Sequence, residues 1–451
     1  MGRHIEQISA TEAFGRATTN AQRRYPTPQA KGNRLYPIAS PVGQPTFQIT
    51  QDETFFTIGS CFARNIESAL ITAGMDVTSR EVNLGIVGDS RGFAPNFFNK
   101  YSVHSIYNDL KWALERDSFP GAEVLYHIDG KDWYADLQMG IPKLKFPVDD
   151  ILAFRTKYLD VITRVAVADV VVITLGYAET WFDTKLGVYL NTSPPLALVK
   201  AEPDRFEFRV LSYDDILSCL HKIRILLEKH RTKPLRMLLT VSPVPLQATF
   251  RDMDVLIANT YSKSVQRAAI DAFVSETTLI DYFPSYEFVT LSNPNVAWKK
   301  GDYRHVSSDL VTLIMENVMD QYIVDENRTK EVGKGESSVA MSLRLMADAQ
   351  EHEALIEAAH EAYDLVHQRA DLMVLFAQAH AHLGKVEQAL DLLISADKLP
   401  SPKGAPLEAL IALICALGRF GTARTYLREH EQRYPTRAGF RSRIMSDYKF
   451  E

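Results

Sequence analysis

The chain has 451 residues, a length that fits two or three domains of ordinary size. Hydrophobic residues make up 46 % and charged residues 24 % of it, as in folded globular proteins, which excludes a disordered or fibrous chain. The net charge of −6 lacks the basic excess of proteins that hold a phosphate backbone, so nucleic acid is not an expected partner.

No stretch of the sequence has the roughly 18 to 20 consecutive apolar residues of a membrane-spanning helix. The first residues contain no apolar segment of signal-peptide length, and a cytoplasmic protein is expected. The cysteines Cys61, Cys219 and Cys415 have neither disulfide-framework nor zinc-site spacing. Because nucleotide-binding glycine loops and metal-ligand clusters are also missing, no cofactor and no metal are expected.

Residues 1–50 are polar and punctuated by prolines, which predicts an extended N-terminal arm. Between 51 and 324, short apolar runs without polar alternation predict buried parallel strands. These runs lie at 54–58, 169–176 and 236–242. Stretches of helical period lie after residue 60 and at 216–227, 255–273 and 307–319. Strands that alternate with helices predict an α/β domain whose parallel sheet is covered on both faces.

Residues 325–338 are charged, contain glycine and serine, and hold no large apolar side chain except two valines, which predicts a linker. The region 339–451 has helical spacing and no strand signal. Within it, Gly384 and Gly418 of an internal repeat lie 34 residues apart, which is the tetratricopeptide period. This region resembles tetratricopeptide hairpins, with an irregular array of helical hairpins as the alternative. Such arrays present a groove to a protein partner.

Ser60 stands where a predicted strand turns into a predicted helix, in Gly59-Ser60-Cys61. This turn lies at the carboxyl edge of the sheet, and open N–H groups of the helix N-terminus can stabilise an oxyanion there. The context is that of a nucleophilic serine, whereas the alternative is that Ser60 only caps the helix. Cys61 is another potential nucleophile, but its side chain is expected to point away from that of Ser60.

The tripeptide 88–90, Gly-Asp-Ser, occurs in many lipases, but Pro95 and the lack of helical period after it argue against Ser90. The partner of Ser60 is expected in the loop 301–305, Gly-Asp-Tyr-Arg-His. There, His305 can lie over the serine while the Asp302 carboxylate orients the other ring nitrogen. The alternative for His305 is a helix-capping or surface histidine.

The pentapeptide 59–63, Gly-Ser-Cys-Phe-Ala, is the signature of the GSCFA family, and the chain resembles this family over about residues 50–320. Further similar blocks follow in the same order at 175–183, 240–250, 258–269 and 281–287. The family is similar to the SGNH/GDSL hydrolases, which hydrolyse or transfer acyl groups. The resemblance implies a three-layer α/β/α SGNH-like parallel sheet domain, followed here by the all-α tetratricopeptide-like domain.

The resemblance also implies roles for individual residues. Ser60 would be the nucleophile, His305 the general base and Asp302 the group that orients it. Backbone donors at Ser60 and Gly176 would form part of the oxyanion hole. These roles describe a triad that needs no cofactor.

The sequence departs from the superfamily at Ala178, where relatives carry an oxyanion-hole asparagine, and Asn99 is the expected replacement. Glu179 is expected either to bind a substrate hydroxyl or to hold a loop through a backbone N–H. Three aromatic residues could stack on a sugar or pack in the core, namely Trp181, Tyr282 and Tyr286.

The predicted function is that of a serine-dependent acyl-ester hydrolase or O-acyltransferase, with an acylated small molecule or glycan as its substrate. The alternative is a binding protein that keeps the SGNH fold without its chemistry and recruits a protein partner through the helical domain. The missing asparagine favours the binding protein, whereas the intact Ser60, Asp302 and His305 favour the enzyme.

Overall fold

The structure is a computed structural model. It describes residues 7–27, 34–80, 98–129, 132–139, 146–323, 332–401, 404–437 and 439–449. The chain divides into two compact units, residues 1–326 and 327–451. The domain limits derived from the sequence, 1–50, 51–324, 325–338 and 339–451, remain predictions.

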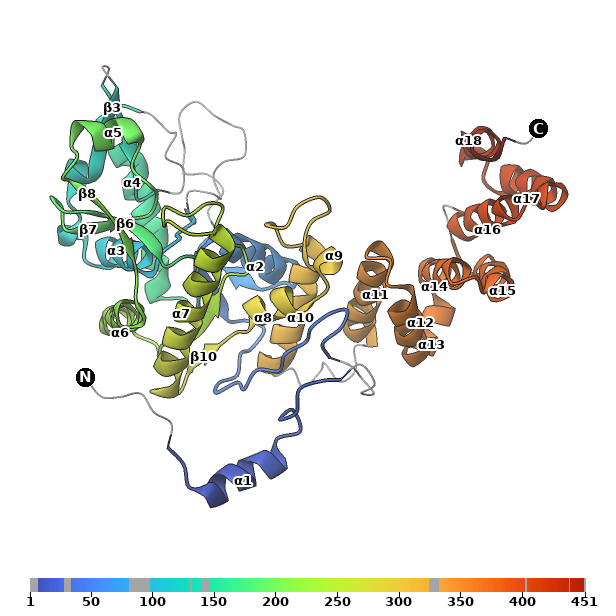
Figure 1. The fold of residues 1–451 in the computed structure, drawn as a ribbon, viewed down its shortest axis with the longest axis horizontal. Helices are drawn as coiled ribbons and strands as arrows, with labels where there is room; N and C mark the ends of the chain where they lie inside the picture. Colours follow the sequence, from blue (N-terminus) through green and yellow to red (C-terminus); the bar gives the residue numbers. More distant parts are fainter. Residues whose placement is uncertain are drawn as a thin grey trace. The chain divides into compact units, whose positions relative to one another are not determined.

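The first unit, which Figure 1 colours from blue through green to yellow, contains a five-stranded parallel sheet. The strands of this sheet follow the order β10-β9-β5-β1-β2. Its strands are β1 (Thr54–Gly59), β2 (Asp76–Val77), β5 (Val170–Leu175), β9 (Arg236–Val241) and β10 (Ile280–Tyr282). The three apolar runs expected as buried strands form β1, β5 and β9. Every residue of β5 is buried, as expected for a central parallel strand with both faces covered.

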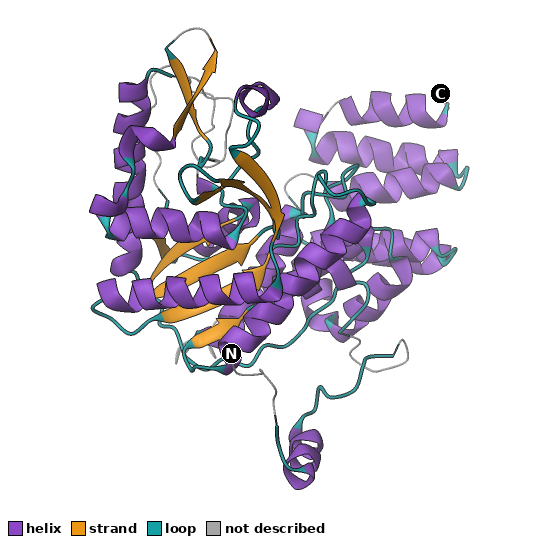
Figure 2. Cartoon of the chain, turned by 60° about the vertical axis from the view of Figure 1, so that its left-hand side comes forward, coloured by secondary structure: helices purple, strands orange, loops and turns teal. Residues whose placement is uncertain are grey.

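Helices cover both faces of this sheet (Figure 2). One face carries α2 (Cys61–Thr72), α8 (Ser285–Leu291) and α10 (Ser308–Tyr322), and the other carries α6 (Tyr213–His230) and α7 (Val255–Ser275). The α/β fold class is therefore confirmed. The first unit further contains α3 (Val103–Leu114), α4 (Val148–Thr163), α5 (Leu196–Ala201) and α9 (Pro294–Ala297).

The strand order determines where a ligand can bind. Along the sheet, β1 has the second strand of the chain on one side and β5 on the other, so the direction of winding reverses between β1 and β5. Open parallel sheets bind ligands outside the carboxyl ends of the strands at such a switch point. Here β1 ends at Gly59 and β5 ends at Leu175, so the residues that follow them are placed at this position.

Two antiparallel sheets were not predicted from the sequence. One consists of β6 (Glu179–Asp183), β7 (Val188–Leu190) and β8 (Phe206–Val210), and the other of β3 (Leu125–Asp129) and β4 (Trp133–Asp136). The segment 175–183 is divided between β5 and β6, because the chain leaves the central sheet after Leu175. The Tyr177 N–H then binds Tyr101 O at 2.7 Å and the Ala178 N–H binds Ser262 Oγ at 2.7 Å.

The N-terminal segment differs from the expected extended arm over residues 10–19, which form the helix α1 (Ala10–Thr19). None of its residues is buried, so it lacks the apolar stripe by which a packed helix is recognised. Local contacts stabilise it instead, since Ser9 Oγ accepts from the Glu12 N–H at 3.1 Å and Arg16 pairs with Glu12 at 2.8 Å.

The described residues of the second unit form helices joined by short turns and loops. Its helices are α11 (Val332–Asp348), α12 (His352–Glu361), α13 (Tyr363–Gln368), α14 (Ala370–His382), α15 (Val386–Ala396), α16 (Ala405–Ala416), α17 (Phe420–Arg433) and α18 (Gly439–Tyr448). Gly384 and Gly418 follow the helices α14 and α16 with φ of 76° and 68°, a conformation that glycine adopts without strain. The first turns of α11 lie within the segment expected as a linker. The tetratricopeptide assignment remains a prediction.

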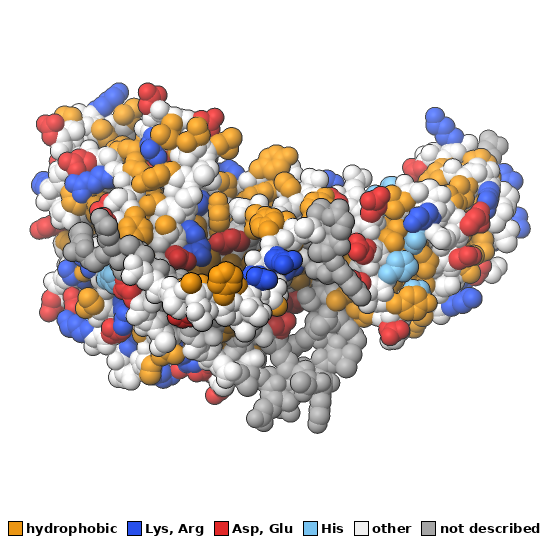
Figure 3. Space-filling view, turned by 60° about the horizontal axis from the view of Figure 1, so that its bottom comes forward, with side chains coloured by type: hydrophobic (Ala, Val, Ile, Leu, Met, Phe, Trp, Pro, Cys, Tyr) orange, Lys and Arg blue, Asp and Glu red, His pale blue; other side chains and the backbone are white. Residues whose placement is uncertain are grey.

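The surface of the described chain carries charges of both signs. On the face drawn in Figure 3, acidic and basic side chains are interspersed. None of the described helices combines the length and the apolar character needed to cross a membrane.

Candidate active site

A pocket of about 670 Å³ lies at the carboxyl ends of β1, β5 and β9. Segments that follow these strands line it, together with β6, β8 and the loop before α10. Its lining includes Cys61 after β1, Tyr177 after β5, Val244 after β9, and the pair Arg304 and His305 before α10. The pocket is thus placed where the strand order predicts a ligand site.

Ser60 is the N-cap of α2. Its Oγ accepts from the Phe62 N–H at 3.3 Å and lies 3.1 Å from Thr174 Oγ1, while its own N–H donates to Thr174 Oγ1 at 2.9 Å. Only 2 % of Ser60 is exposed, and it is not among the described residues that line the pocket. These contacts are those of the helix-capping alternative, and the nucleophilic role of Ser60 stays a prediction.

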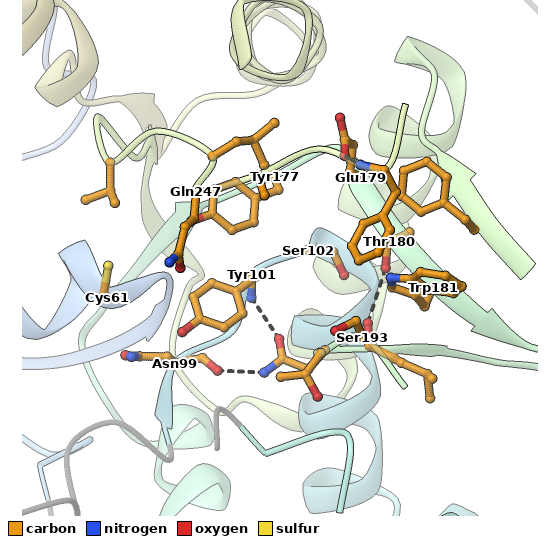
Figure 4. A pocket seen from close by; sticks show the side chains of 18 of the residues that line it. Cys61, Asn99, Tyr101, Ser102, Tyr177, Glu179, Thr180, Trp181, Ser193 and Gln247 are labelled. Carbon is orange, nitrogen blue, oxygen red and sulfur yellow. Dashed lines mark hydrogen bonds between the residues drawn. The ribbon is translucent and has the colours of Figure 1, made fainter. Parts of the chain in front are cut away.

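Cys61, the first residue of α2, lines the pocket and is partly exposed. Figure 4 shows its side chain at the beginning of the helix, on the side of the pocket where Tyr101 and Gln247 also lie. Burial raises the pKa of the Cys61 thiol, and this effect outweighs the lowering by the positive charges of Lys263 and Arg304. The thiol is therefore protonated at neutral pH.

Asp302 and His305 form a hydrogen-bonded pair in the loop before α10, with His305 Nδ1 on Asp302 Oδ2. Asp302 Oδ1 also accepts from the N–H groups of Arg304, at 2.5 Å, and of His305, at 3.2 Å. The hydrogen bond from His305 is the main cause that lowers the pKa of Asp302 to about 2. The pairing at Nδ1 leaves Nε2 of His305 without this carboxylate and available to the pocket that the residue lines.

The structure does not join this pair to Ser60. Among the described residues, His305 makes no hydrogen bond with Ser60, although both belong to the carboxyl end of the sheet. The Ser90 tripeptide lies outside the described residues.

A buried lysine lies under the pocket. Lys263 of α7 is fully buried, and its Nζ donates to Gly176 O and Val244 O, each at 2.8 Å. Burial lowers the pKa of Lys263 to about 7. The carbonyl of Gly176 is thereby held between β5 and β9, and a Cβ on Gly176 would lie 2.7 Å from Tyr101 O. Gly176 is not among the described lining residues, so its expected role as an oxyanion donor stays a prediction.

Asn99 lies beside the end of β1 and lines the pocket, and only 3 % of it is exposed. Asn191 holds this segment in place, because its Nδ2 donates to Asn99 O at 2.9 Å and its Oδ1 accepts from the Tyr101 N–H at 2.8 Å (Figure 4). The Asn99 side chain is hydrogen-bonded to Tyr101. The role of Asn99 as an oxyanion donor remains a prediction.

Glu179 holds the loop that follows β9. Its Oε1 accepts from Thr249 Oγ1 at 2.7 Å and its Oε2 from the Phe250 N–H at 3.4 Å. These contacts are those of the loop-holding alternative, and the residue also lines the pocket. Substrate binding by Glu179 stays a prediction.

An aromatic wall stands beside Glu179. Trp181, Phe208 and Phe250 pack with ring centroids 5.1 to 5.6 Å apart, and all three line the pocket. Tyr282 and Tyr286, considered together with Trp181 from the sequence, are not among the described lining residues. The Tyr282 hydroxyl instead donates to Glu287 at 2.7 Å, and Tyr286 packs against the core.

Several residues of the site were missed in the sequence, above all Lys263, Arg304 and the stacked rings of Tyr101 and Tyr177. Arg304 hydrogen-bonds to the side chain of Tyr177. The sequence shows a polar interruption around Lys263 but not its contacts with the site. Three polar residues occupy buried positions on one side of α7, namely Ser262, Lys263 and Gln266, and polar residues in a core are kept only when they have partners.

The profile of the GSCFA family matches residues 54–318, more than half of the chain. The chain belongs to the GSCFA family. The matched range begins at β1 and ends within α10, so it contains the pocket of this GSCFA domain and excludes the helical unit. No curated protein and no solved structure matches the chain. The family match supports a hydrolase-like domain and names no substrate.

Proposed function

We propose that this GSCFA protein is an acyl-ester hydrolase or O-acyltransferase of SGNH type, acting on an O-acyl group of a carbohydrate or glycan. The observation that carries the proposal is the Asp302–His305 pair on a pocket whose wall includes the beginning of α2. The Gly59-Ser60-Cys61 turn then supplies the nucleophile, which from the sequence is Ser60.

The pair has the arrangement that general base catalysis requires. Asp302 accepts the Nδ1 hydrogen of His305, which leaves Nε2 to take a proton from the nucleophile and later to give it to the leaving alcohol. At the start of α2 the Phe62 N–H donates to Ser60 Oγ and the Ala63 N–H donates to Ser60 O. Our proposed donors to the oxyanion are therefore the Cys61 N–H, Asn99 and Gly176.

The pocket lining suits an acylated sugar. The aromatic wall of Trp181, Phe208 and Phe250 offers apolar area to a sugar ring or an acyl chain. Hydroxyl and amide groups also line the pocket, at Thr180, Thr192, Ser193 and Gln247, and can bind sugar hydroxyls. A volume of about 670 Å³ lies within the range of about 300 to 1,000 Å³ for small-molecule sites.

The test is release of acetate from an O-acetylated xylo-oligosaccharide and hydrolysis of p-nitrophenyl acetate. His305→Ala should lower both rates at least about 100-fold, because the proton transfer loses its base. The matched control is His221→Ala, since His221 also pairs with a carboxylate, Glu276 at 2.7 Å, but does not line this pocket. If the folded parent hydrolyses neither ester, the proposal is wrong.

One observation favours the binding protein that we keep as the second candidate. Ala178 stands where an asparagine is usual. Its methyl group has no hydrogen to donate, and its N–H is already taken by Ser262 Oγ, so Ala178 does not replace that donor. In that case the parent should bind the acetylated oligosaccharide in calorimetry without releasing acetate. The helical unit would then serve to recruit a protein partner.

A further inference from the structure

We propose that the acyl group is carried by Cys61, so that the site works through a thioester rather than a serine ester. This inference rests on the proposed acyl transfer and concerns its nucleophile. Two neighbouring side chains that follow β1, those of Ser60 and Cys61, have different surroundings.

Ser60 and Cys61 face different parts of the molecule. The Ser60 Oγ is engaged by Thr174 Oγ1 and by the Phe62 N–H, and only 2 % of the residue is exposed. Cys61, one residue later, belongs to the pocket wall (Figure 4). The residue that reaches a ligand in this pocket without a change of the helix N-terminus is therefore the cysteine.

The pocket that Cys61 lines also holds the base. His305 lines the same pocket, and its Nδ1 is occupied by Asp302, which directs Nε2 toward proton exchange. The positive charge of Arg304, which lies between Asp302 and His305 in the loop, opposes the rise that burial causes in the pKa of the thiol. The cysteine and the imidazole thus line one pocket, and the carboxylate is paired with the imidazole.

The surroundings of the sulfur favour its reaction. Cys61 is the first residue of α2, where the helix N-terminus stabilises a negative charge. The buried Lys263 adds a positive charge that acts on the sulfur. Burial nevertheless keeps the thiol protonated at rest, which explains why the site needs His305 as a base.

The chemical steps follow from these positions. Nε2 of His305 takes the proton of the thiol, and Sγ attacks the carbonyl carbon of the ester. The bond from that carbon to the alcohol oxygen breaks, and His305 gives the proton to the leaving alcohol. Water or an acceptor hydroxyl then gives its proton to His305 and attacks the thioester, the C–S bond breaks, and the sulfur regains its proton.

The experiment compares four variants in p-nitrophenyl acetate hydrolysis, with the acyl-enzyme trapped by acid quench and located by peptide mass spectrometry. Cys61→Ala should lower turnover at least about 1,000-fold and abolish the adduct, because the nucleophile is lost. Ser60→Ala removes only a helix cap and should lower turnover less than about ten-fold, with a lower melting temperature. Cys61→Ser should replace the hydroxylamine-labile thioester with a more resistant oxyester.

Cys415→Ala is the matched control, because Cys415 is buried in the second unit and should leave turnover and adduct unchanged. An acetyl group found on Ser60, or an active Cys61→Ala next to an inactive Ser60→Ala, would overturn the inference and leave the proposed function standing. If the folded parent forms no adduct and turns over neither this ester nor the acetylated oligosaccharide, the proposed function is wrong and the inference falls with it.

Discussion

Gly59 lies against Thr174 so closely that a Cβ at position 59 would stand 2.2 Å from Thr174 O and 2.5 Å from its Oγ1. The φ of Gly59 is 139°, a conformation that side chains rarely adopt. The turn from β1 into α2 is therefore available only to glycine, and it places both Ser60 and Cys61.

The first prediction is that Gly59→Ala damages the site and the fold together. The added methyl would displace Thr174 and with it the hydrogen bonds of Ser60, so we expect a loss of about 2 to 4 kcal/mol in the free energy of unfolding. Urea unfolding followed by tryptophan fluorescence measures it. Gly121→Ala serves as the control, since φ is 65° there but no atom lies within 4 Å of the new Cβ. Equal losses in the two variants would show that the contact with Thr174 is unimportant.

The central strands of the sheet could be predicted from the sequence, because a strand that is buried on both faces has an apolar sequence. β1, β5 and β9 are mostly apolar and do not alternate between polar and apolar residues, so they were recognised as central strands. In β8, Glu207 and Arg209 alternate with aromatic residues on an exposed antiparallel sheet, and this pattern was not recognised. The sequence pattern of a short strand with one solvent-exposed face is too weak to distinguish the strand from a loop.

The candidate site could likewise be predicted from the sequence only in part. Asp302 and His305 are three residues apart in one loop, so their contact depends on local geometry and could be anticipated. Whether Ser60 or Cys61 faces the pocket depends on the backbone conformation at Gly59 and the first turn of α2, which the sequence does not state. Lys263 of α7 contacts Gly176 O and Val244 O, which are distant from it in the sequence, so only the tertiary fold determines these contacts.

The second prediction concerns Asp302→Asn. The amide can still accept from the N–H groups of Arg304 and His305, so the loop should keep its shape. It cannot hold the correct tautomer of His305, and we expect kcat to fall by about 1,000-fold or more. Because the pKa of Asp302 is lowered to about 2, its carboxylate is ionised at every pH above about 4. The fall in kcat should therefore be present at pH 8, and equal rates of parent and variant at that pH would contradict this role.

The third prediction tests the aromatic wall. Phe250 is 62 % exposed and packs edge-on against Trp181, with centroids 5.1 Å apart. Phe250→Ala should raise KM for an acetylated xylo-oligosaccharide about ten-fold, the effect of about 1.4 kcal/mol of lost contact, and should spare p-nitrophenyl acetate. Phe14→Ala on α1 is the control, because Phe14 is exposed to an even greater extent outside the pocket. A fall in kcat with both substrates would instead assign Phe250 a structural role.

The fourth prediction concerns His104, whose ring packs on Tyr189 with centroids 4.1 Å apart. Burial, assisted by the charge of Lys222, lowers its pKa to about 4. The unfolded chain binds a proton at His104 below about pH 6.5 while the folded chain does not, so stability falls as the pH drops from 6.5 toward 4. We expect a loss of about 2 to 3 kcal/mol between pH 7 and pH 4.5 that is absent in His104→Phe. Urea titrations of both proteins at the two pH values measure the difference. Parallel losses in parent and variant would show that another group is responsible.

The last prediction concerns the buried Lys263 and the stability of the protein above pH 7. Its pKa is lowered to about 7, whereas in the unfolded chain it keeps its usual value near 10.4, so above pH 7 the unfolded state binds the extra proton. The parent should therefore gain about 2 to 3 kcal/mol of stability relative to Lys263→Met between pH 7 and pH 9. A lysine with only a structural role would show this dependence of stability on pH and would not affect the reactivity of Cys61.

A lysine that also acts on the sulfur should change its reactivity. The charge of Lys263 lowers the pKa of Cys61, so Lys263→Met should slow alkylation of Cys61 by iodoacetamide at pH 7 and move its midpoint to higher pH. Lys229→Met is the control, because Lys229 pairs with Glu115 on the surface at 2.6 Å and does not line the pocket. If Lys263→Met changes stability with pH but leaves the alkylation profile of Cys61 where it was, the lysine supports the two loops through Gly176 O and Val244 O and takes no part in activating the cysteine.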